Sequence, residues 1–358
     1  MKRFRIDMLP AQEGDCFWIE YGDPDHPWKL LVDGGKSGTY NAIRQRLESL
    51  PGDERHIELL IVSHVDADHI EGILKLLGDP DLGVSYGDIW FNGWRHLPGS
   101  DIEDFGPVQG ERLTTLLDKE EQHWNKLFNK FAVSIPGHGS LPTYALEGGM
   151  KITLLSPSGD ELKKLRPYWE KECIKAGLDP QRNPPPIIPP PGIEIFGPPD
   201  VESLVNLSFN ADDSEANGSS IAVLAEFAGR CALLAGDAYP DVLLSGIRRL
   251  PGLEEDDRLQ LDVFKLPHHG SKANIHRDLL AKIDCSRYLF STNGANHKHP
   301  DREAVARVIK FGGESPELIF NYKTEFNLIW NNNQLIERYG YSVSYPDTNT
   351  TGQTIDLL

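Results

Sequence analysis

The chain has 358 residues, 39% of them hydrophobic, and 54 acidic side chains against 36 lysines and arginines give it a formal charge of -18. This length is enough to bury a core as one large domain or two modest ones, so the composition indicates a globular protein. The acidic charge gives no support to a polyanionic partner such as nucleic acid, although a local cationic rim or a bound metal could override the average.

The first residues, 1–7, lack the apolar run of a signal peptide, and no stretch of the sequence is apolar for long enough to span a bilayer. The four cysteines, Cys16, Cys173, Cys231 and Cys285, form no C-x-x-C pair. We interpret them as small buried side chains in a reducing compartment. We therefore expect a cytoplasmic protein without membrane association; the sequence leaves a protein partner undetermined.

The N-terminal part predicts strands and helices in alternation. Residues 17–21 and 29–32 read as two strands around a turn, and residues 41–50 as a helix with one apolar face. Residues 57–62 predict a short buried strand that stops at Ser63, and a second helix is expected from about 68 to 77.

The middle of the chain, about 81–215, is less regular, and we interpret it as an insertion within a single domain spanning 1–358. It contains an expected strand at 88–91 and an expected helix from about 109 to 127. Residues 182–199 contain two runs of three prolines, which exclude helix and central sheet. We interpret this segment as a stiff extended loop, with a rim over the active site as the alternative.

The strand and helix rhythm then resumes. Expected strands lie at 221–227, 231–235, 261–266 and 287–290, and a last strand pair at 317–320 and 326–330 precedes an acidic, polar tail. Strands with intervening helices indicate an α/β fold with mixed sheets.

Four potential metal ligands stand within six residues, where the strand 57–62 ends and a helix begins. They are His64, Asp66, Asp68 and His69. Loops at strand ends carry the sites of α/β folds, because the sheet holds them rigidly while their side chains stay exposed. Imidazole and carboxylate are the ligands of zinc, manganese and iron. The run therefore predicts a metal site.

This run resembles the His-x-His-x-Asp-His signature of metallo-β-lactamase-fold hydrolases, with Asp66 in place of the second His. The His-x-Asp-x-Asp-His form, followed by Ile70-Glu71-Gly72, is most similar to the nuclease-type domain of ComEC competence proteins. Further segments resemble motifs of those domains in the same order: residues 12–19, 31–35, 217–221, 234–237, 265–271 and 296–300. The resemblance covers residues 1 to about 77 and 217 to about 310.

The resemblance implies an αββα sandwich and two divalent ions, Zn2+ or Mn2+, bridged by Asp237. It places His64 and Asp66 on the first ion, and Asp68, His69 and His299 on the second. The first ion lacks the third His of classical members, since Asn217, Ser219 and Ser220 stand in that region. Oxygen-rich coordination there favours manganese over zinc, or leaves the position weak or empty.

Asp68, His268 and His269 are the expected catalytic side chains. One of the two histidines is expected to meet a substrate oxygen or protonate the leaving group, and the other to be held by backbone. We favour His269 for chemistry because it abuts Gly270-Ser271, where backbone can approach a substrate. Outside the matched segments, His96 and His138 are candidates to line the pocket, and Asp15 and Asp33 are expected to fix turns near the metals.

The resemblance favours a phosphodiesterase or nuclease that uses a metal-activated water at a dinuclear site. Two alternatives remain: a hydrolase of another ester, such as a phosphocholine ester or a lactone, and a non-catalytic relative that binds through a partly emptied site. The acidic charge mildly favours a hydrolase of another ester over a nuclease. The near-complete motif set disfavours the non-catalytic relative. The chain brings no membrane segments of the ComEC type, so DNA uptake is not implied.

Overall fold

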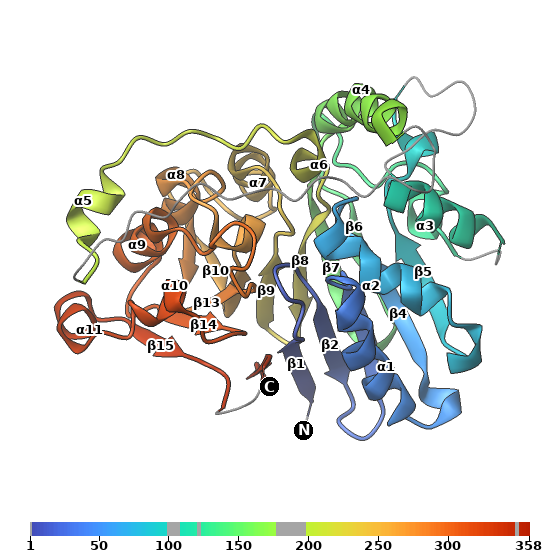
Figure 1. Ribbon diagram of the computed structural model, residues 1–358, viewed down its shortest axis with the longest axis horizontal. Helices are drawn as coiled ribbons and strands as arrows, with labels where there is room; N and C mark the ends of the chain where they lie inside the picture. The colour runs from blue at the N-terminus through green and yellow to red at the C-terminus, as the bar shows by residue number, and fades with distance from the viewer. Residues whose placement is uncertain (1, 99–107, 120–122, 177–197, 348–350) are drawn as a thin grey trace.

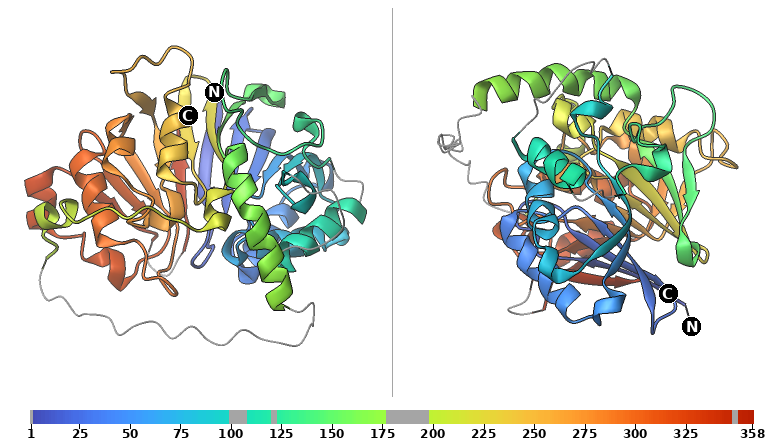
Figure 2. Two further views of the ribbon diagram at one scale, coloured as in Figure 1. Left: turned by 90° about the horizontal axis from the view of Figure 1, so that it is seen from above. Right: turned by 90° about the vertical axis from the view of Figure 1, so that its right-hand side faces the viewer.

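The computed structural model describes residues 2–98, 108–119, 123–176, 198–347 and 351–358. Two large sheets pack against each other, and helices cover the outer face of each sheet (Figures 1 and 2). The αββα sandwich predicted from the sequence is therefore confirmed. None of the helices described in these ranges is both long and apolar enough to cross a membrane.

The first sheet has six strands in the order β16-β1-β2-β3-β4-β5. Strands β3, β4 and β5 run parallel to one another, and β1 is antiparallel to both of its neighbours. The strands are β1 (Arg3–Met8), β2 (Phe17–Gly22), β3 (Pro27–Val32), β4 (His56–Ile61), β5 (Ser85–Trp90) and β16 (Gln353–Asp356).

The second sheet has eight strands in the order β15-β14-β13-β11-β9-β8-β7-β6, and β10 and β12 form a separate parallel pair. Strands β9, β11, β13, β14 and β15 are parallel. The strands are β6 (Thr143–Ala145), β7 (Lys151–Ser156), β8 (Ala222–Phe227), β9 (Arg230–Leu234), β10 (Leu259–Leu261), β11 (Val263–Lys265), β12 (Ile283–Cys285), β13 (Arg287–Phe290), β14 (Glu317–Phe320) and β15 (Ser342–Ser344).

Helices α1, α2 and α3 lie on the first sheet, and α7, α8 and α9 on the second (Figure 1). The helices are α1 (Tyr40–Glu48), α2 (Ala67–Leu77), α3 (Val108–Lys119), α4 (Gly159–Ala176), α5 (Val201–Val205), α6 (Glu215–Gly218), α7 (Pro240–Ile247), α8 (Arg277–Ala281), α9 (Arg302–Phe311), α10 (Glu325–Leu328) and α11 (Asn333–Tyr339).

The apolar strands of the first sheet are buried on both faces. Leu59 and Ile61 of β4 pack into the core between the sheets, whereas Leu60 packs beneath the helices together with Ile70 and Ile73 of α2. Because side chains alternate along a strand, a continuous apolar run serves two cores at once. The sheets therefore form a rigid base for the loops at their ends.

The predicted helix at 109–127 is wrong in its second half, because α3 ends at Lys119. Asn125 has a positive φ of 50°, and its side chain is fully buried. Its Oδ1 accepts a hydrogen bond from the Phe91 amide, and its Nδ2 donates one to the Phe91 carbonyl. The Trp124 indole also donates to the carbonyl of Phe91. These contacts fix residues 124 and 125 as a connection to the first sheet.

The predicted strand at 326–330 is also wrong, since Glu325–Leu328 form α10. The side chain of Asn327 accepts a hydrogen bond from the Thr324 amide and donates to the Tyr322 carbonyl, which closes a helical turn. β15 is the strand that pairs with β14. The expected polar tail contains β16, which pairs with β1 and buries Ile355.

The predicted strand at 261–266 is divided at Asp262, whose carboxylate accepts from the Cys231 amide and the Arg230 guanidinium. The middle of the chain adds strands to both sheets, β5 to the first and β6 and β7 to the second. Of the predicted proline-rich loop at 182–199, residues 182–197 lie outside the described residues.

Glycines bring the turn after β3 into direct contact with α2. A Cβ on Gly72 would lie 2.0 Å from the carbonyl oxygen of Gly34, and one on Gly34 would lie 2.6 Å from the amide nitrogen of Ile73. Only residues without a side chain permit this approach. It places Asp33, which precedes the turn, beside His69 in the first turn of the helix.

Candidate metal centre

The predicted site residues come together at the carboxyl ends of the parallel strands of both sheets. His64 follows β4, Asp237 follows β9, the pair His268 and His269 follows β11, and His299 follows β13. Parallel strands bring their carboxyl ends to one edge, where α/β folds bind ligands. Asp66, Asp68, Asp237, His268, His269 and His299 line one pocket, and His64 and His69 lie behind it in contact with Asp237.

One carboxylate oxygen, Oδ2 of Asp237, faces four imidazoles. It lies 3.5 Å from Nε2 of both His69 and His269, and 3.9 Å from Nε2 of both His64 and His268. All five side chains except that of His268 are almost completely buried. The arrangement gathers four nitrogen donors around a single oxygen.

The opposite nitrogen, Nδ1, of each imidazole is held by another group. His69 contacts Oδ2 of Asp33 at 2.8 Å, and His269 contacts the carbonyl oxygen of Ser291 at 2.9 Å. Because these partners only accept, Nδ1 donates and the lone pair of the neutral ring is on Nε2. The other two contacts are His64 with Ser63 Oγ at 3.0 Å and His268 with Asn274 Oδ1 at 3.0 Å.

The His-His-Gly turn has an unusual backbone that directs both rings inward. His268, His269 and Gly270 all have positive φ, of 49°, 54° and 83°. Left-handed residues other than glycine cost on the order of 1–3 kcal/mol each and occur where the surrounding structure enforces them. Here the His268 amide donates to the Gly236 carbonyl, and the Gly270 carbonyl accepts from the Asp301 amide.

Asp66 and Asp68 extend from the beginning of α2 toward the same point. Asp66 precedes the helix, and its Oδ2 lies 3.5 Å from Nε2 of His64. Oδ2 of Asp68 lies 3.4 Å from Nε2 of His269 and 4.0 Å from that of His69. The contacts divide the cluster into a His64 and Asp66 side and an Asp68, His69 and His269 side, with Asp237 between them.

A buried ion pair lies beneath the cluster. Nζ of Lys265 binds Asp15 and donates to the carbonyl of Gly236, 2.7 Å away. It also lies 3.7 Å from Oδ1 of Asp237. Asp15 contacts the Nδ1 side of His269, at 3.4 Å, so it lies behind the imidazole and not before its Nε2.

Charge in the cluster shifts several pKa values. Burial lowers the pKa of His269, but the carboxylates of Asp237 and Asp15 outweigh it and raise that pKa to about 10. Burial raises the pKa of the Asp237 carboxyl, but the facing imidazoles of His269, His69 and His268 outweigh this effect and hold it well below its usual range. Burial and the neighbouring His268 and His269 hold the pKa of His299 well below its usual value.

The pocket in front of the cluster has a volume of about 280 Å³. His299 lines it, as do Asp66, Asp68, Asp237, His268 and His269. His96 and His138, the two lesser candidates for the pocket lining, do not line it. His96 is buried against Trp124, and His138 is exposed away from this lining.

Asp212 belongs to the pocket and was missed in the sequence. Its Oδ2 lies 3.2 Å from Nδ1 of His268 and accepts from the Asn217 and Asn274 amides. It stands five positions before Asn217, so the Asn-x-x-Ser segment was the signal that could have led to it. Asp33 behaves as expected, since its carboxylate accepts from the Ser63 amide after β4. The Asp15 carboxylate pairs with Lys265 and, among the described residues, holds no turn; it lies close enough to His69, Asp237 and His269 for these four side chains to offer ligand atoms within 4.8 Å of one another.

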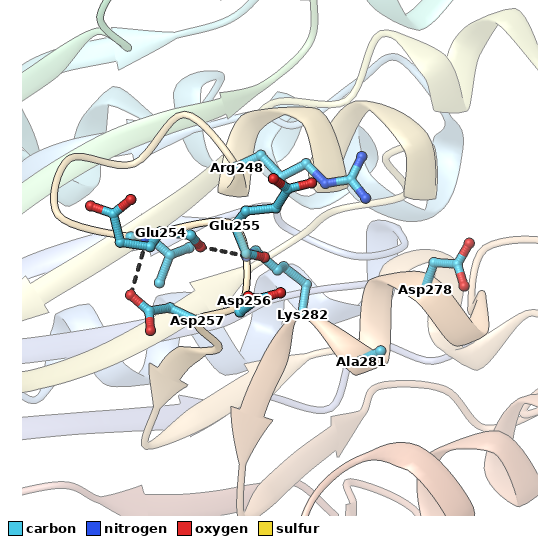
Figure 3. Close-up of a pocket in the computed structure, with 9 residues that line it drawn as sticks. Arg248, Glu254, Glu255, Asp256, Asp257, Asp278, Ala281 and Lys282 are labelled. Carbon is cyan, nitrogen blue, oxygen red and sulfur yellow. Dashed lines mark hydrogen bonds between the residues drawn. The ribbon is translucent and has the colours of Figure 1, made fainter.

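A second, larger hollow of about 700 Å³ lies between α7, α8 and the connection to β10 (Figure 3). Carboxylates and two cationic side chains line it, and Lys282 Nζ donates to the carbonyls of Glu254 and Glu255. No imidazole or thiol lines this hollow among the described residues. The donor set of the first pocket is therefore the candidate site.

No protein-family model matches the chain, and no curated protein matches it in sequence. Among solved structures, CmlA, a diiron β-hydroxylase from Streptomyces venezuelae, aligns over 100% of this chain and 55% of its own, at 12% identity and a TM-score of 0.43. Zn2+-bound PqqB from Methylobacterium extorquens aligns over 99% of this chain and 100% of its own, at 14% identity and a TM-score of 0.39. The short form of human tRNase Z aligns over 98% of each chain, at 11% identity and a TM-score of 0.39. This chain thus spans about half the length of CmlA.

Proposed function

We propose that this chain is a metal-dependent hydrolase of the metallo-β-lactamase fold that cleaves a phosphoester with two divalent ions. The observation that carries the proposal is the position of Asp237 Oδ2, within 3.9 Å of the Nε2 atoms of four histidines. Each of these rings has its Nδ1 in contact with another group, as outer-shell partners orient metal-binding imidazoles.

Several nitrogen and oxygen atoms of the cluster lack hydrogen-bond partners within the described part of the protein, and bound metal ions would supply partners for them. Nε2 of His64 is buried without a hydrogen-bond partner among the described residues. Oδ1 of Asp237 also has no hydrogen-bond partner among them, but it faces Lys265 Nζ at 3.7 Å and not the imidazoles. Nε2 of His69 and His269 lie 3.3 Å apart, with lone pairs facing each other in the neutral rings. Buried polar groups are normally paired, so unpaired donors directed at one point favour an ion.

We assign His64, Asp66 and His268 to one ion, Asp68, His69 and His269 to the other, and Asp237 to both. This assignment gives the first ion a second imidazole, which the motif comparison did not provide, because Nε2 of His268 lies 3.9 Å from Oδ2 of Asp237. It also moves His269 from the substrate to the metal and leaves His299 out of the ligand set. Zn2+ accepts both groups of nitrogen and carboxylate donors, and Mn2+ remains an alternative for the first.

When bound, two such ions lower the pKa of water and stabilise both ends of an in-line displacement. The residues of this chain hold the geometry. Asp33 and Ser291 orient the imidazoles of His69 and His269, and Lys265 balances the charge of Asp15 and Asp237. The strained His268-His269 turn keeps both rings directed at Asp237.

Metal content and turnover measured on one preparation test the proposal. We expect about two equivalents of Zn2+ or Mn2+ per chain and metal-dependent hydrolysis of bis(p-nitrophenyl) phosphate, with single-stranded DNA as a second substrate. A chain that binds no metal, or that binds two ions and cleaves no phosphoester, would refute it.

The charge of the pocket favours a second candidate, hydrolysis of an ester without negative charge. None of the described lining residues is a lysine or arginine. Five carboxylates line the pocket, those of Glu13, Asp66, Asp68, Asp212 and Asp237. Such a lining opposes a polyanion until ions neutralise it. Turnover of a lactone or a phosphocholine ester at a higher kcat/KM than bis(p-nitrophenyl) phosphate would select this candidate.

A further inference from the structure

His299 lines the pocket of the metal centre but does not belong to the four imidazoles that face Asp237. Among the described carboxylates, only that of Asp301 approaches one of its ring nitrogens within 4.0 Å, at 3.6 Å from Nδ1. Nδ1 of His299 is buried on the side of Asp301 and makes no hydrogen bond to a described residue. Because the 3.6 Å contact with Asp301 is longer than a hydrogen bond, no acceptor among the described residues holds a proton on Nδ1, and the neutral ring can carry its proton on Nε2.

Two contacts hold the ring at a fixed place beside the proposed ions. Its centroid lies 5.4 Å from that of His268 on the metal side, and 5.8 Å from that of His297, which stacks on it at 24°. The exposed fraction of the His299 side chain is 11%. A ring enclosed in this way is preorganised to meet a ligand without losing much conformational freedom.

The backbone on either side of the ring is tied to the metal centre. The Asp301 amide donates to the Gly270 carbonyl at 3.0 Å, and a Cβ on Gly270 would lie 2.9 Å from Cβ of Pro300. On the other side, the Lys298 amide donates to the Gly294 carbonyl in a turn where Lys298 has a φ of 59°. The loop of His299 and the turn of His269 therefore form one unit.

We propose that His299 is a substrate-binding residue whose Nε2 donates a hydrogen bond to an oxygen of the phosphoester held at the two ions. This proposal rests on the proposed function for the identity of the bound group. Phosphoryl oxygens accept strong hydrogen bonds, and this pocket has no described lysine or arginine to supply them. His299 thus provides a ring N–H donor in a lining whose described residues include no lysine or arginine.

Two variants and one control test this role on the full chain. His299→Ala removes the imidazole, and His299→Gln keeps an amide N–H near the position of Nε2. His26→Gln is the matched control, because His26 is an exposed side chain in the turn between β2 and β3, at the opposite end of β3 from the site. Each protein is measured for metal stoichiometry by mass spectrometry, for affinity toward inorganic phosphate by calorimetry, and for melting temperature.

We expect all four proteins, including the wild type, to bind the same number of ions. Phosphate affinity should fall at least about tenfold in His299→Ala, as for loss of a hydrogen bond to a charged group, and less in His299→Gln. Loss of metal in His299→Ala would overturn the proposal, because His299 would then be a ligand. Unchanged phosphate affinity, or a metal-loaded wild type that binds no phosphate, would also overturn it. Failure of the proposed function appears separately, as a loaded wild type that binds phosphate but hydrolyses no phosphoester.

Discussion

Nε2 of His69 lies 3.3 Å from Nε2 of His269, although 200 positions separate the two residues in the chain. Their Nδ1 atoms contact Asp33 and the Ser291 carbonyl, so neither ring can turn its lone pair away without losing a buried partner. Two facing lone pairs repel each other unless a proton or a metal ion lies between them. The arrangement of these two atoms is therefore stable only when a proton or a metal ion lies between them.

Asp237→Asn should lower the metal content from two ions per chain and reduce turnover to background. The amide retains the volume of the side chain but loses the charge that faces four imidazoles. Metal analysis and phosphodiester hydrolysis measure the effect. Asp241→Asn is the control, because Asp241 is exposed in the first turn of α7. Full metal content with normal turnover in Asp237→Asn would exclude a bridging role.

His269→Ala distinguishes a metal ligand from a substrate contact. The distances to His69, Asp68 and Asp237 favour a ligand of the ion that Asp68 and His69 would hold. Loss of a residue that only orients a ligand typically weakens metal binding about 10–100-fold, so loss of His269 itself should weaken binding of this ion by at least that much. Added Zn2+ or Mn2+ should restore part of the activity. A variant that keeps both ions and loses only rate would return His269 to the substrate role first expected from its motif.

Asp33→Asn should weaken metal binding about 10–100-fold without removing a ligand. Asp33 accepts hydrogen bonds from His69 Nδ1, the Ser63 amide and the Ser63 hydroxyl, and all of these partners are buried. An amide can accept from only some of them, so His69 loses its orientation. Competition with a chelator measures the affinity of wild type and variant side by side. Equal affinities would show that Asp33 serves only the turn after β3.

Metal affinity should increase with pH through neutrality. Burial opposes protonation of His269, but Asp237 and Asp15 raise its pKa to about 10, and the pKa of His268 is raised as well, again against burial, by Asp237 and Asp212. The metal-free chain therefore holds protons at pH 7 that an ion must displace, so lower pH weakens binding and higher pH strengthens it. Calorimetry in buffers with different ionisation heats should detect proton release. An affinity that is constant from pH 6.5 to 8.5 would contradict these assignments.

His96 should make the protein less stable in acid. Burial, assisted by the neighbouring Arg95, lowers its pKa from 6.5 to about 4. The unfolded chain therefore binds more protons between these values, and the free energy of unfolding falls as pH drops from about 6.5 to about 4, by about 3 kcal/mol. His96→Asn, which keeps an acceptor for the Gly93 amide, should show a smaller fall over this range. His138→Gln, at an exposed position, should follow the wild type in urea unfolding at each pH.

Local signals were sufficient for most of the fold. The apolar run of β4 and the one-sided pattern of α1 predict their elements because burial follows the periodicity of the side chains. The strand expected at 326–330 failed because the hydrogen bonds of one side chain, Asn327, outweigh an apolar pattern. β16 was missed because its partner, β1, is more than 340 positions away and no local pattern identifies that pairing.

The site was predictable as a set of residues but not as a set of roles. Motif order indicated that residues from 64 to 299 converge; Asp66, Asp68, Asp237 and His299 line one pocket, and His64 and His69 contact Asp237. Whether His268, His269 or His299 faces Asp237 depends on the left-handed backbone at two successive histidines, which composition and spacing do not reveal. Asp212 depends on a contact with His268 across 56 positions, and no spacing rule connects them.

The pairing of β1 with β16 has a consequence for the order in which the chain folds. Ile6 lies opposite Ile355, so this edge of the first sheet cannot form until residues 353–356 have left the ribosome. Until then β1 presents one unpaired edge, and exposed strand edges are prone to pair with other chains. A chain truncated before residue 353 should therefore aggregate more readily than one that includes residues 353–356, even with the rest of both sheets in place.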